Sequence, residues 1–285
     1  ASQAAQDPAA AQSLTLATNA KMTARNVAQK FRPDPVDRVD GTVLKLMEDP
    51  ITYVESFLRG LGPAELNGAG AGFCKEFTSL ISKYPFNPSA SAQATVAEFN
   101  AIFAPQTGSL WTFYDTKLKA MLVNQGGEYR AVPTPAMALT PAFVAAFNRF
   151  AAVTATAYGM NPSPNFKYSV KLNAEMKREV RLAIDGQSAE FKNAGSPAKQ
   201  FVWNGQGVGV RTTIVGGGTV SFDGPLGVFQ WFNDAERWNQ NSATSHTVLW
   251  YQRSGTKIMT DDQGKPLSMT LDLEMPIPLF RKGYL

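Results

Sequence analysis

The sequence predicts an α+β protein in which an N-terminal helical domain precedes a C-terminal antiparallel β-sandwich. Apolar residues recur at helical spacing in the first part of the chain and at every second position in the last part. The spacing changes at residues 159–164, a stretch rich in Pro and Gly. These observations place a helical domain at residues 1–160 and a β-sandwich domain at residues 161–285.

Amphipathic helical patterns separated by Pro and Gly fill the first part of the chain. The first three are expected over residues 9–31, 37–47 and 50–61. The Gly-rich stretch 67–72 is expected to weaken any helix that crosses it, because Gly costs about 1 kcal/mol relative to Ala inside a helix. After it, one apolar stripe marks a fourth helix: Phe73, Phe77, Leu80, Ile81 and Tyr84.

Further helices and a loop complete the helical part. Each helix carries an aromatic stripe, around Phe99, Phe113 and Phe147 in turn. We interpret these aromatic residues as core rather than as cofactor contacts, since they recur at helical spacing. Residues 125–135 are expected to form a loop because of their Gly and Pro content.

Short strands separated by turn residues make up the last part of the chain. Residues 226–238 interrupt the alternation and are expected to form a short helix or an ordered crossover. No long helix lies between the strands, which favours a sandwich or barrel over a parallel sheet. The strands are expected over residues 166–172, 180–184, 200–203, 208–215, 219–222, 246–252, 257–260 and 267–275.

Composition and charge restrict the classes of function that are open to the chain. Its 285 residues are 44% hydrophobic and 18% charged, which is typical of a globular protein rather than a disordered one. The net charge of +4 comes from Lys and Arg residues spread along the chain, without a run that would follow a nucleic-acid backbone. We therefore expect no nucleic-acid partner.

The chain is expected to be a piece of a longer protein that does not itself cross a membrane. Its start, Ala1-Ser2-Gln3, has neither an initiator Met nor a signal pattern. No apolar stretch approaches the roughly 20 residues that a transmembrane helix needs. The single cysteine, Cys74, excludes an intrachain disulfide and fits the cytosol and the periplasm equally well.

The sequence lacks the groups of reactive side chains that define common enzyme classes. The only histidine, His246, lies in a predicted strand, and no Gly-x-Ser-x-Gly motif accompanies it. One Cys and one His far apart do not make a zinc site. The Gly clusters at 205–209 and 216–218 precede strand-like sequence, whereas a phosphate-binding loop opens a helix. We predict no catalytic, cofactor-binding or metal-binding residue.

Several short motifs follow one another in an order that points to a known family. Those of the helical part include Tyr84-Pro85-Phe86 and the Phe-rich helix that ends at Pro105. Those of the β part include Asp185-Gly186-Gln187 and Trp203-Asn204-Gly205. Over residues 25–275, the sequence resembles the C-terminal periplasmic region of the TssM (IcmF) family, the large inner-membrane subunit of bacterial type VI secretion systems.

The resemblance implies a location and a role. The chain would lie in the bacterial periplasm, tethered to the inner membrane through upstream segments that it does not contain. It would bind the outer-membrane lipoprotein TssJ and other subunits of the secretion membrane complex, and the full-length protein would self-associate. The implied role is structural, without enzymatic activity or a cofactor. Asn204, Leu226 and Gln230 depart from the family pattern, which has Pro, Trp and Arg there, and this concerns local packing rather than the fold.

Two neighbouring residues are candidates for partner binding. Arg237 and Trp238 are of the types that carry much of the binding energy at protein interfaces, and the polar segment Asn239-Gln240-Asn241 that follows indicates exposure. The alternative is that Trp238 closes the sandwich core.

Two other functions stay open for the chain as a whole. A glycan-acting envelope enzyme would use paired carboxylates in a deep pocket. A carbohydrate-binding sandwich would present a row of exposed aromatic residues on one sheet face.

The Trp238→Ala variant separates the two interpretations of Trp238. If the side chain anchors a partner, the variant binds the lipoprotein more weakly in a pull-down and keeps the melting temperature of the unmodified chain. Loss of folding together with binding would instead assign the side chain to the core.

Overall fold

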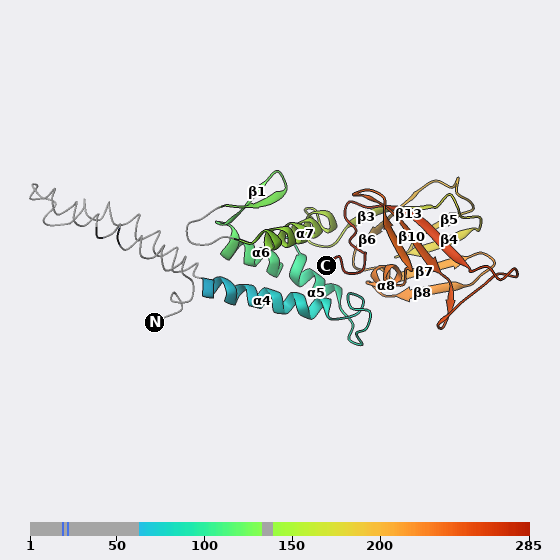
Figure 1. Cartoon of the computed structure of the whole chain (residues 1–285), viewed down its shortest axis with the longest axis horizontal. Helices are drawn as coiled ribbons and strands as arrows, with labels where there is room; N and C mark the ends of the chain where they lie inside the picture. The colour runs from blue at the N-terminus through green and yellow to red at the C-terminus, as the bar shows by residue number, and fades with distance from the viewer. Residues whose placement is uncertain (1–18, 20–21, 23–62, 133–138) are drawn as a thin grey trace, which may run out of the picture. The chain divides into compact units, whose positions relative to one another are not determined.

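In a computed structural model of the chain, the described residues are 19, 22, 63–132 and 139–285. The three helices predicted before residue 62 lie outside them, apart from Asn19 and Met22, which are helical and exposed. Helices dominate the described chain up to residue 158 and strands dominate it afterwards (Figure 1). This order confirms the predicted α+β class, in which a helical part is followed by antiparallel sheets.

The chain divides into two compact units, and each is described by itself below. One contains Phe113–Asn148 with the residues before Lys75, and the other contains Lys75–Thr112 with Arg149–Leu285. The domain boundary near residue 160 stays a prediction. The described helical elements are α4 (Pro63–Ile81), α5 (Val96–Phe103), α6 (Ser109–Phe113), the π-helical turn η1 (Tyr114–Leu118), α7 (Pro141–Ala157) and α8 (Gly227–Asn233).

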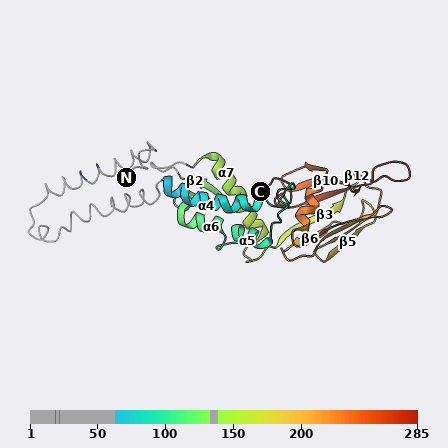
Figure 2. The ribbon, with the colours of Figure 1, turned by 90° about the horizontal axis from the view of Figure 1, so that it is seen from below.

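Helix α4 continues through the Gly-rich stretch where we expected a weak point (Figures 1 and 2). A Cβ atom on Gly70 would lie 3.6 Å from the ring of Phe113, in ordinary van der Waals contact. The Phe73 ring stacks on the same Phe113 ring, with centroids 5.9 Å apart. The stacking of Phe73 on Phe113 helps to hold the helix together against the low helix propensity of Gly, which costs about 1 kcal/mol per residue relative to Ala.

The prediction of a loop at residues 125–135 is wrong over the first part of that range, where the chain forms a β-hairpin. β1 (Leu122–Gln125) pairs with β2 (Glu128–Ala131) across a turn at Gly126-Gly127. Both Gly residues have positive φ angles, 67° and 96°, as tight hairpin turns require. The dipeptide Gly-Gly between two short strands was the signal for this turn.

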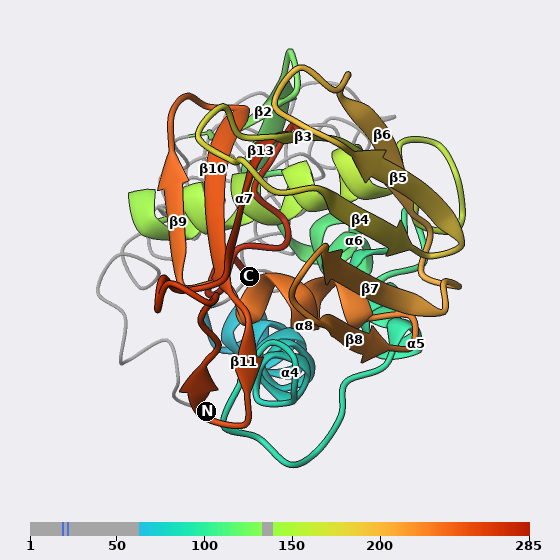
Figure 3. The ribbon, with the colours of Figure 1, turned by 90° about the vertical axis from the view of Figure 1, so that its right-hand side faces the viewer.

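The strands after α7 form two antiparallel sheets (Figure 3). One has five strands in the order β6-β3-β13-β10-β9, and the other has four in the order β5-β4-β7-β8. The short β11 (Arg253–Ser254) and β12 (Lys257–Ile258) pair with each other. The main strands are β3 (Phe166–Leu172), β4 (Val180–Ile184), β5 (Gln187–Phe191), β6 (Lys199–Trp203), β7 (Gly209–Ile214), β8 (Thr219–Asp223), β9 (Arg237–Gln240), β10 (Ser245–Tyr251) and β13 (Ser268–Glu274).

The regular alternation of buried and exposed residues explains why most of these strands were predictable. In β10 and β13 every second side chain is buried, so the apolar pattern and the strand period agree. β5 and β9 were not predicted. Each carries few apolar residues and forms because a neighbouring strand supplies its hydrogen-bond partners.

The sandwich is closed along the edge where β5 lies beside β6. The Gln187 side chain at the start of β5 donates to the carbonyl oxygen of Val202 in β6 (2.9 Å) and accepts from its N–H (3.2 Å). One amide therefore satisfies both backbone groups of a residue on the terminal strand of the five-stranded sheet, as a further strand would do.

Asp185 fixes the turn that brings Gln187 to this edge. Its φ angle of 48° is left-handed, which Asp tolerates better than most residues. Its backbone N–H donates to the carbonyl oxygen of Gly209 (2.8 Å), and its carboxylate accepts from the Gly209 N–H (3.0 Å). Burial raises the pKa of Asp185 to about 6, although the bond from Gly209 acts in the opposite direction.

An aromatic cluster at one end of the sandwich joins it to the helical residues of the same unit. The cluster contains Phe99 of α5, Trp203 of β6, Phe229 of α8 and Phe280 of the C-terminal segment. The Phe99 ring meets Trp203 edge to face at 5.5 Å and lies 6.3 Å from Phe229. Trp203, Phe229 and Phe280 contact one another at 4.9–6.2 Å. Phe99 and Trp203 are both 0% exposed, so this cluster is the core of the unit.

Truncation of Phe99 tests the importance of this cluster. We expect Phe99→Ala to lower the free energy of unfolding by about 3–5 kcal/mol, because it leaves a cavity among rings that cannot collapse onto it. Urea unfolding, followed by the fluorescence of the packed tryptophans, measures the loss. Phe99→Leu, which fills most of the space, should cost clearly less, and equal small losses for both variants would contradict the assignment.

Candidate partner interface at the α8 edge

The edge of the sandwich opposite Gln187 is filled by a helix rather than by strand pairing. β8 and β9 are the terminal strands of the two sheets on this side, and α8 connects them in sequence (Figure 3). We call this region, made of β8, α8 and β9, the α8 edge. The helix is bound to the five-stranded sheet by a hydrogen bond from Trp250 Nε1 to the carbonyl oxygen of Trp231 (2.8 Å).

The sequence of α8 explains why it is buried here. Val228, Phe229, Trp231 and Phe232 are apolar on several sides of a short helix, and all are buried. Gly227 at its start permits the close approach, because a Cβ atom there would lie 2.4 Å from the carbonyl oxygen of Phe222 in β8. The predicted short helix within residues 226–238 is thus present.

The structure places both predicted anchor residues on β9, on opposite faces of the strand. Arg237 is exposed and lies opposite Leu249, whereas Trp238 is half-buried and lies opposite the buried Val248. The Trp238 ring packs 5.3 Å from that of Phe232. The expectation that residues up to 238 belong to a helix or crossover is wrong for this pair, because pairing with β10 makes them a strand. Their role in binding a partner stays a prediction.

Trp238 also bonds to the only histidine. Its Nε1–H donates to Nδ1 of His246 (3.2 Å), which is 0% exposed on the inner face of β10. A neutral ring that accepts at Nδ1 carries its proton on Nε2, and this buried atom has no hydrogen-bond partner. Burial lowers the pKa of His246, and the positive charge of Arg281 adds to the effect.

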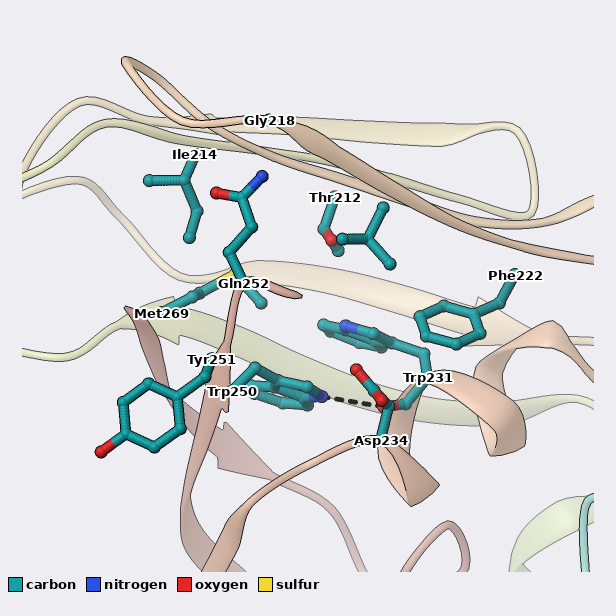
Figure 4. A pocket seen from close by; sticks show the side chains of 11 residues that line it. Thr212, Ile214, Gly218, Phe222, Trp231, Asp234, Trp250, Tyr251, Gln252 and Met269 are labelled. Carbon is teal, nitrogen blue, oxygen red and sulfur yellow. Dashed lines mark hydrogen bonds between the residues drawn. The ribbon is translucent and has the colours of Figure 1, made fainter. Parts of the chain in front are cut away.

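A pocket opens at the α8 edge between the two sheets. Its interior is small, with about 20 Å³ of room for water-sized molecules. The rings of Trp231 and Trp250 stack at 4.7 Å on one side of it, and Gln252 reaches toward Gly218 on the other (Figure 4). Sequence reasoning missed these residues, because they come from strands and a helix that are distant along the chain.

Asp234 supplies the carboxylate of this pocket. It follows α8 directly, and burial raises its pKa, with Glu236 acting in the same direction and Arg253 against it. Arg253 is itself paired with Glu236 at 2.7 Å. Within the described ranges, no group of three or more His, Cys, Asp and Glu residues could hold a metal ion. The site thus offers hydrogen bonds and apolar surface, which are means of binding.

One family model matches a stretch of the helical part of the chain. The model described as the type VI secretion protein IcmF helical domain matches residues 72–161. This part of the chain is similar to the IcmF helical domain. This match covers most of α4 and all of α5, α6 and α7, and it agrees with the resemblance to the TssM family that the motifs indicated.

The fold is similar to that of solved type VI secretion proteins. The T6SS protein TssM C-terminal domain from EAEC aligns with a TM-score of 0.57 and 18% identity, over 77% of this chain and 94% of that chain. A chain of a type VI secretion system membrane core complex aligns with a TM-score of 0.60 and 17% identity, over 93% of this chain and 54% of that chain. A chain of a type VI membrane complex aligns with a TM-score of 0.59 and 17% identity, over 93% of this chain and 51% of that chain.

The present chain therefore spans about half the length of the chains in those two complexes. No curated protein matches the sequence. Over 77% of its length, the chain has a fold similar to that of a TssM C-terminal domain. None of the helices in the described part of the chain has the length and apolar composition needed to cross a bilayer.

His246 provides a test of the electrostatics at this edge. We expect it to titrate below the ordinary histidine pKa of 6.5, because burial and Arg281 disfavour the protonated ring. The unfolded chain then binds more protons than the folded chain as the pH falls below 6.5, so His246 lowers stability in acid. Since the sequence has one histidine, its ring proton signal in an NMR titration reports the pKa directly.

The matched variant is His246→Gln, in which the acid-dependent loss of stability from this position should disappear. Asp185 acts with the opposite sign, since its raised pKa stabilises the fold as the pH decreases, so thermal melts are best compared in an Asp185→Asn background. A His246 midpoint at or above 6.5 would show that the ring is solvated or paired with an anion.

Proposed function

We propose that the chain is a structural, partner-binding module of the type VI secretion membrane complex. In this role it docks the outer-membrane lipoprotein TssJ and other copies of its own subunit on the periplasmic side. The observation that carries the proposal is the likeness in fold, over 93% of the chain, to chains of two type VI membrane complexes. The IcmF helical domain at residues 72–161 supports the same assignment independently.

The α8 edge is the surface that we assign to the lipoprotein. β9 is a terminal strand, so the backbone groups on its outer side are available to a partner. Arg237 is exposed on this strand, and a guanidinium can make several directed hydrogen bonds at an interface. Trp238 contributes by holding β9 against Phe232 rather than by contacting the partner with its whole ring.

We also propose that the chain is not an enzyme. The polar lining of the pocket consists of the Asp234 carboxylate, the Gln252 amide, two indoles and the hydroxyl groups of Thr212 and Tyr251, and it contains no His, Cys or Lys that could act as the base of a nucleophilic pair. The alternative of a glycan-acting enzyme requires two carboxylates roughly 5 to 10 Å apart in one pocket. The pocket at the α8 edge contains only Asp234, and the pocket beside Phe229 and the C-terminal segment contains no Asp or Glu side chain.

The alternative of a carbohydrate-binding sandwich finds no support on the surface. Stacking on sugar rings needs exposed aromatic faces on one sheet. Every Phe, Tyr and Trp side chain in the described residues is buried or half-buried. The exposed large apolar residues of that part of the chain are aliphatic, such as Met160 and Val208.

The location follows from the role. The chain would lie in the periplasm and would be tethered to the inner membrane through upstream segments. TssJ, anchored in the outer membrane, would then hold the sandwich from the other side of the envelope. A module under such tension gains from the closed edge at Gln187 and from the aromatic core around Phe99, which resist opening of the sheets.

A pull-down with the lipoprotein encoded near this gene tests the proposal. We expect the unmodified chain to retain the lipoprotein and Arg237→Glu to reduce the affinity by about tenfold or more, the usual effect of reversing a charge at an anchor. The control is Arg211→Glu, which alters an equally exposed arginine on the outer face of the other sheet. Failure of the unmodified chain to bind, or equal losses for both variants, would contradict the assignment.

A further inference from the structure

Strand β8 ends the four-stranded sheet with an unprotected edge (Figure 3). It pairs only with β7 among the described strands, and its sequence, Thr219-Val220-Ser221-Phe222-Asp223, has no Lys, Arg or Pro. Natural proteins usually place such residues on free edges to prevent pairing with another chain. The edge of β8 is therefore suited to accept a further strand.

The register of β8 determines which of its backbone groups face outward. The N–H of Gly224 donates to the carbonyl oxygen of Val208 (3.0 Å), so this pair is one of the bonded pairs of the ladder with β7. Bonded and non-bonded pairs alternate along an antiparallel ladder. Counting back from Gly224, the backbone groups of Val220 and Phe222 bond to β7. The backbone groups that face the open side belong to Thr219, Ser221 and Asp223.

These three outward residues are accessible. Their side chains lie on the outer face of the sheet, and all three are exposed. Their backbone groups take part in no hydrogen bond within the described part of the chain. Because Ser221 in the middle of the strand is exposed, no described segment, including the helix α8, covers this edge.

The sequence of β8 is complementary to itself about Ser221. If two copies of the strand meet antiparallel about a two-fold axis at this residue, Ser221 faces Ser221 of the second copy and Thr219 faces its Asp223. The Thr219 hydroxyl, which lies 2.8 Å from that of Thr213, can accept there and donate to the Asp223 carboxylate of the second copy. No like charges meet in this arrangement.

The other side of the strand is complementary as well. Val220 and Phe222 lie opposite Thr212 and Val210 of β7 and are only half-buried. About the same axis, Val220 faces Phe222 of the second copy at a non-bonded pair, where opposite side chains approach most closely. Pairs of an aromatic and a β-branched side chain stabilise antiparallel ladders. The pairing would therefore cover apolar surface that the single chain leaves partly exposed.

Other positions of the axis pair the two strands less completely. With the axis at Val220, the end of the strand would face the turn Gly217-Gly218 of the second copy. With the axis at Phe222, its start would face Gly224-Pro225, and Pro has no N–H to donate. Only the axis at Ser221 places a strand residue opposite each residue of β8.

From this arrangement we infer that β8 is a self-association edge, through which two copies of the chain pair antiparallel and join their four-stranded sheets into one continuous sheet. The same surface is used on both copies, so the pairing closes on itself as a dimer. The inference rests on the proposed docking of other copies of the subunit and names the surface that does it. It leaves β9 and Arg237, which belong to the other sheet, to the lipoprotein.

The size of the contact determines how strong the dimer is. One short strand from each copy buries less surface than a stable interface needs, so we expect weak association of the free chain. Copies tethered side by side in one membrane meet at an effective concentration that reaches the millimolar range. A measurement on the free chain therefore uses a covalent trap or a high protein concentration.

Cysteine cross-linking tests the position of the axis. Cys74→Ser removes the exposed native thiol, and Ser221→Cys in this background places two thiols in a bonded pair. The Cα atoms of such a pair are about 5.5 Å apart, within the range of a disulfide. We expect Ser221→Cys to form covalent dimers under mild oxidation at least about tenfold faster than Thr219→Cys, whose thiols would lie about 13 Å apart.

A mixture of two variants tests the register independently. Neither Thr219→Cys nor Asp223→Cys should cross-link efficiently alone, because each residue lies four positions away from its own copy. Together the two variants should form a mixed disulfide, since residue 219 of one copy faces residue 223 of the other. Non-reducing gels separate the products in both experiments.

Charged variants test the dimer without a covalent trap. Ser221→Lys or Ser221→Glu alone should abolish the association that sedimentation detects at millimolar protein, because two like charges then face each other. Mixing the two variants should restore it. The control is Ala183→Lys, which adds a charge to the same outer face at β4, away from the edge, and should leave association unchanged. Thermal melts verify that each variant is folded.

Several results would overturn the inference. They are a monomeric unmodified chain at millimolar concentration, cross-linking of Thr219→Cys as fast as that of Ser221→Cys, and a mixture of the Lys and Glu variants that stays monomeric. Loss of the lipoprotein in a pull-down with Ser221→Lys would assign the edge to that protein instead. The pull-down with Arg237→Glu concerns the other sheet, so failure of the proposed docking of the lipoprotein and failure of the dimer are distinguishable.

Discussion

The packing of Phe99 against Trp203 and Phe229 is the contact on which the rest of this structure depends. It joins a helix, a strand of the five-stranded sheet and the helix α8 in one buried cluster. Phe229 and Trp231 are two residues apart in α8 and therefore lie on different sides of the helix, so the helix that packs on Phe99 also places Trp231 against Trp250. The position of the α8 edge therefore depends on core packing on the other side of the same helix.

The two edges of the sandwich show how the same physical requirement has two solutions. Terminal strands expose backbone groups that attract other strands. Along one edge, Gln187 satisfies those of Val202 within the molecule. At the α8 edge a helix separates β8 from β9, and a helix cannot pair with their backbones. This difference leaves one side of the sandwich available for partners, which is the property that a docking module needs.

Buried polar groups occur both at the edge closed by Gln187 and at the α8 edge. Asp185 is tied to Gly209 and belongs to the closed edge, where its carboxylate helps to fix a turn. Trp231 Nε1 and Gln252 Oε1 are unpaired and belong to the α8 edge. His246 lies between the core and β9 and carries its accepting nitrogen toward Trp238. Unsatisfied buried atoms occur on both sides, since the second carboxylate oxygen of Asp185 also has no hydrogen-bond partner.

The sequence by itself determined the fold class and most strands. The alternation in residues 166–172 and 267–275 coincides with the period of a half-buried strand, so the local pattern was sufficient. It did not determine β5 or β9, whose few apolar residues form strands only because a neighbour completes their hydrogen bonds, nor the course of α4 through its glycines, which depends on contacts with Phe113.

The candidate site was decided by the tertiary structure alone. Arg237 and Trp238 are adjacent in sequence but face opposite sides of a strand, because strand geometry alternates the direction of successive side chains. Trp231 and Gln252 line one pocket although many residues separate them, since the closing of two sheets around α8 is a long-range event. Local periodicity contains no information about which distant residues come together, because their contact arises from the packing of several elements at once.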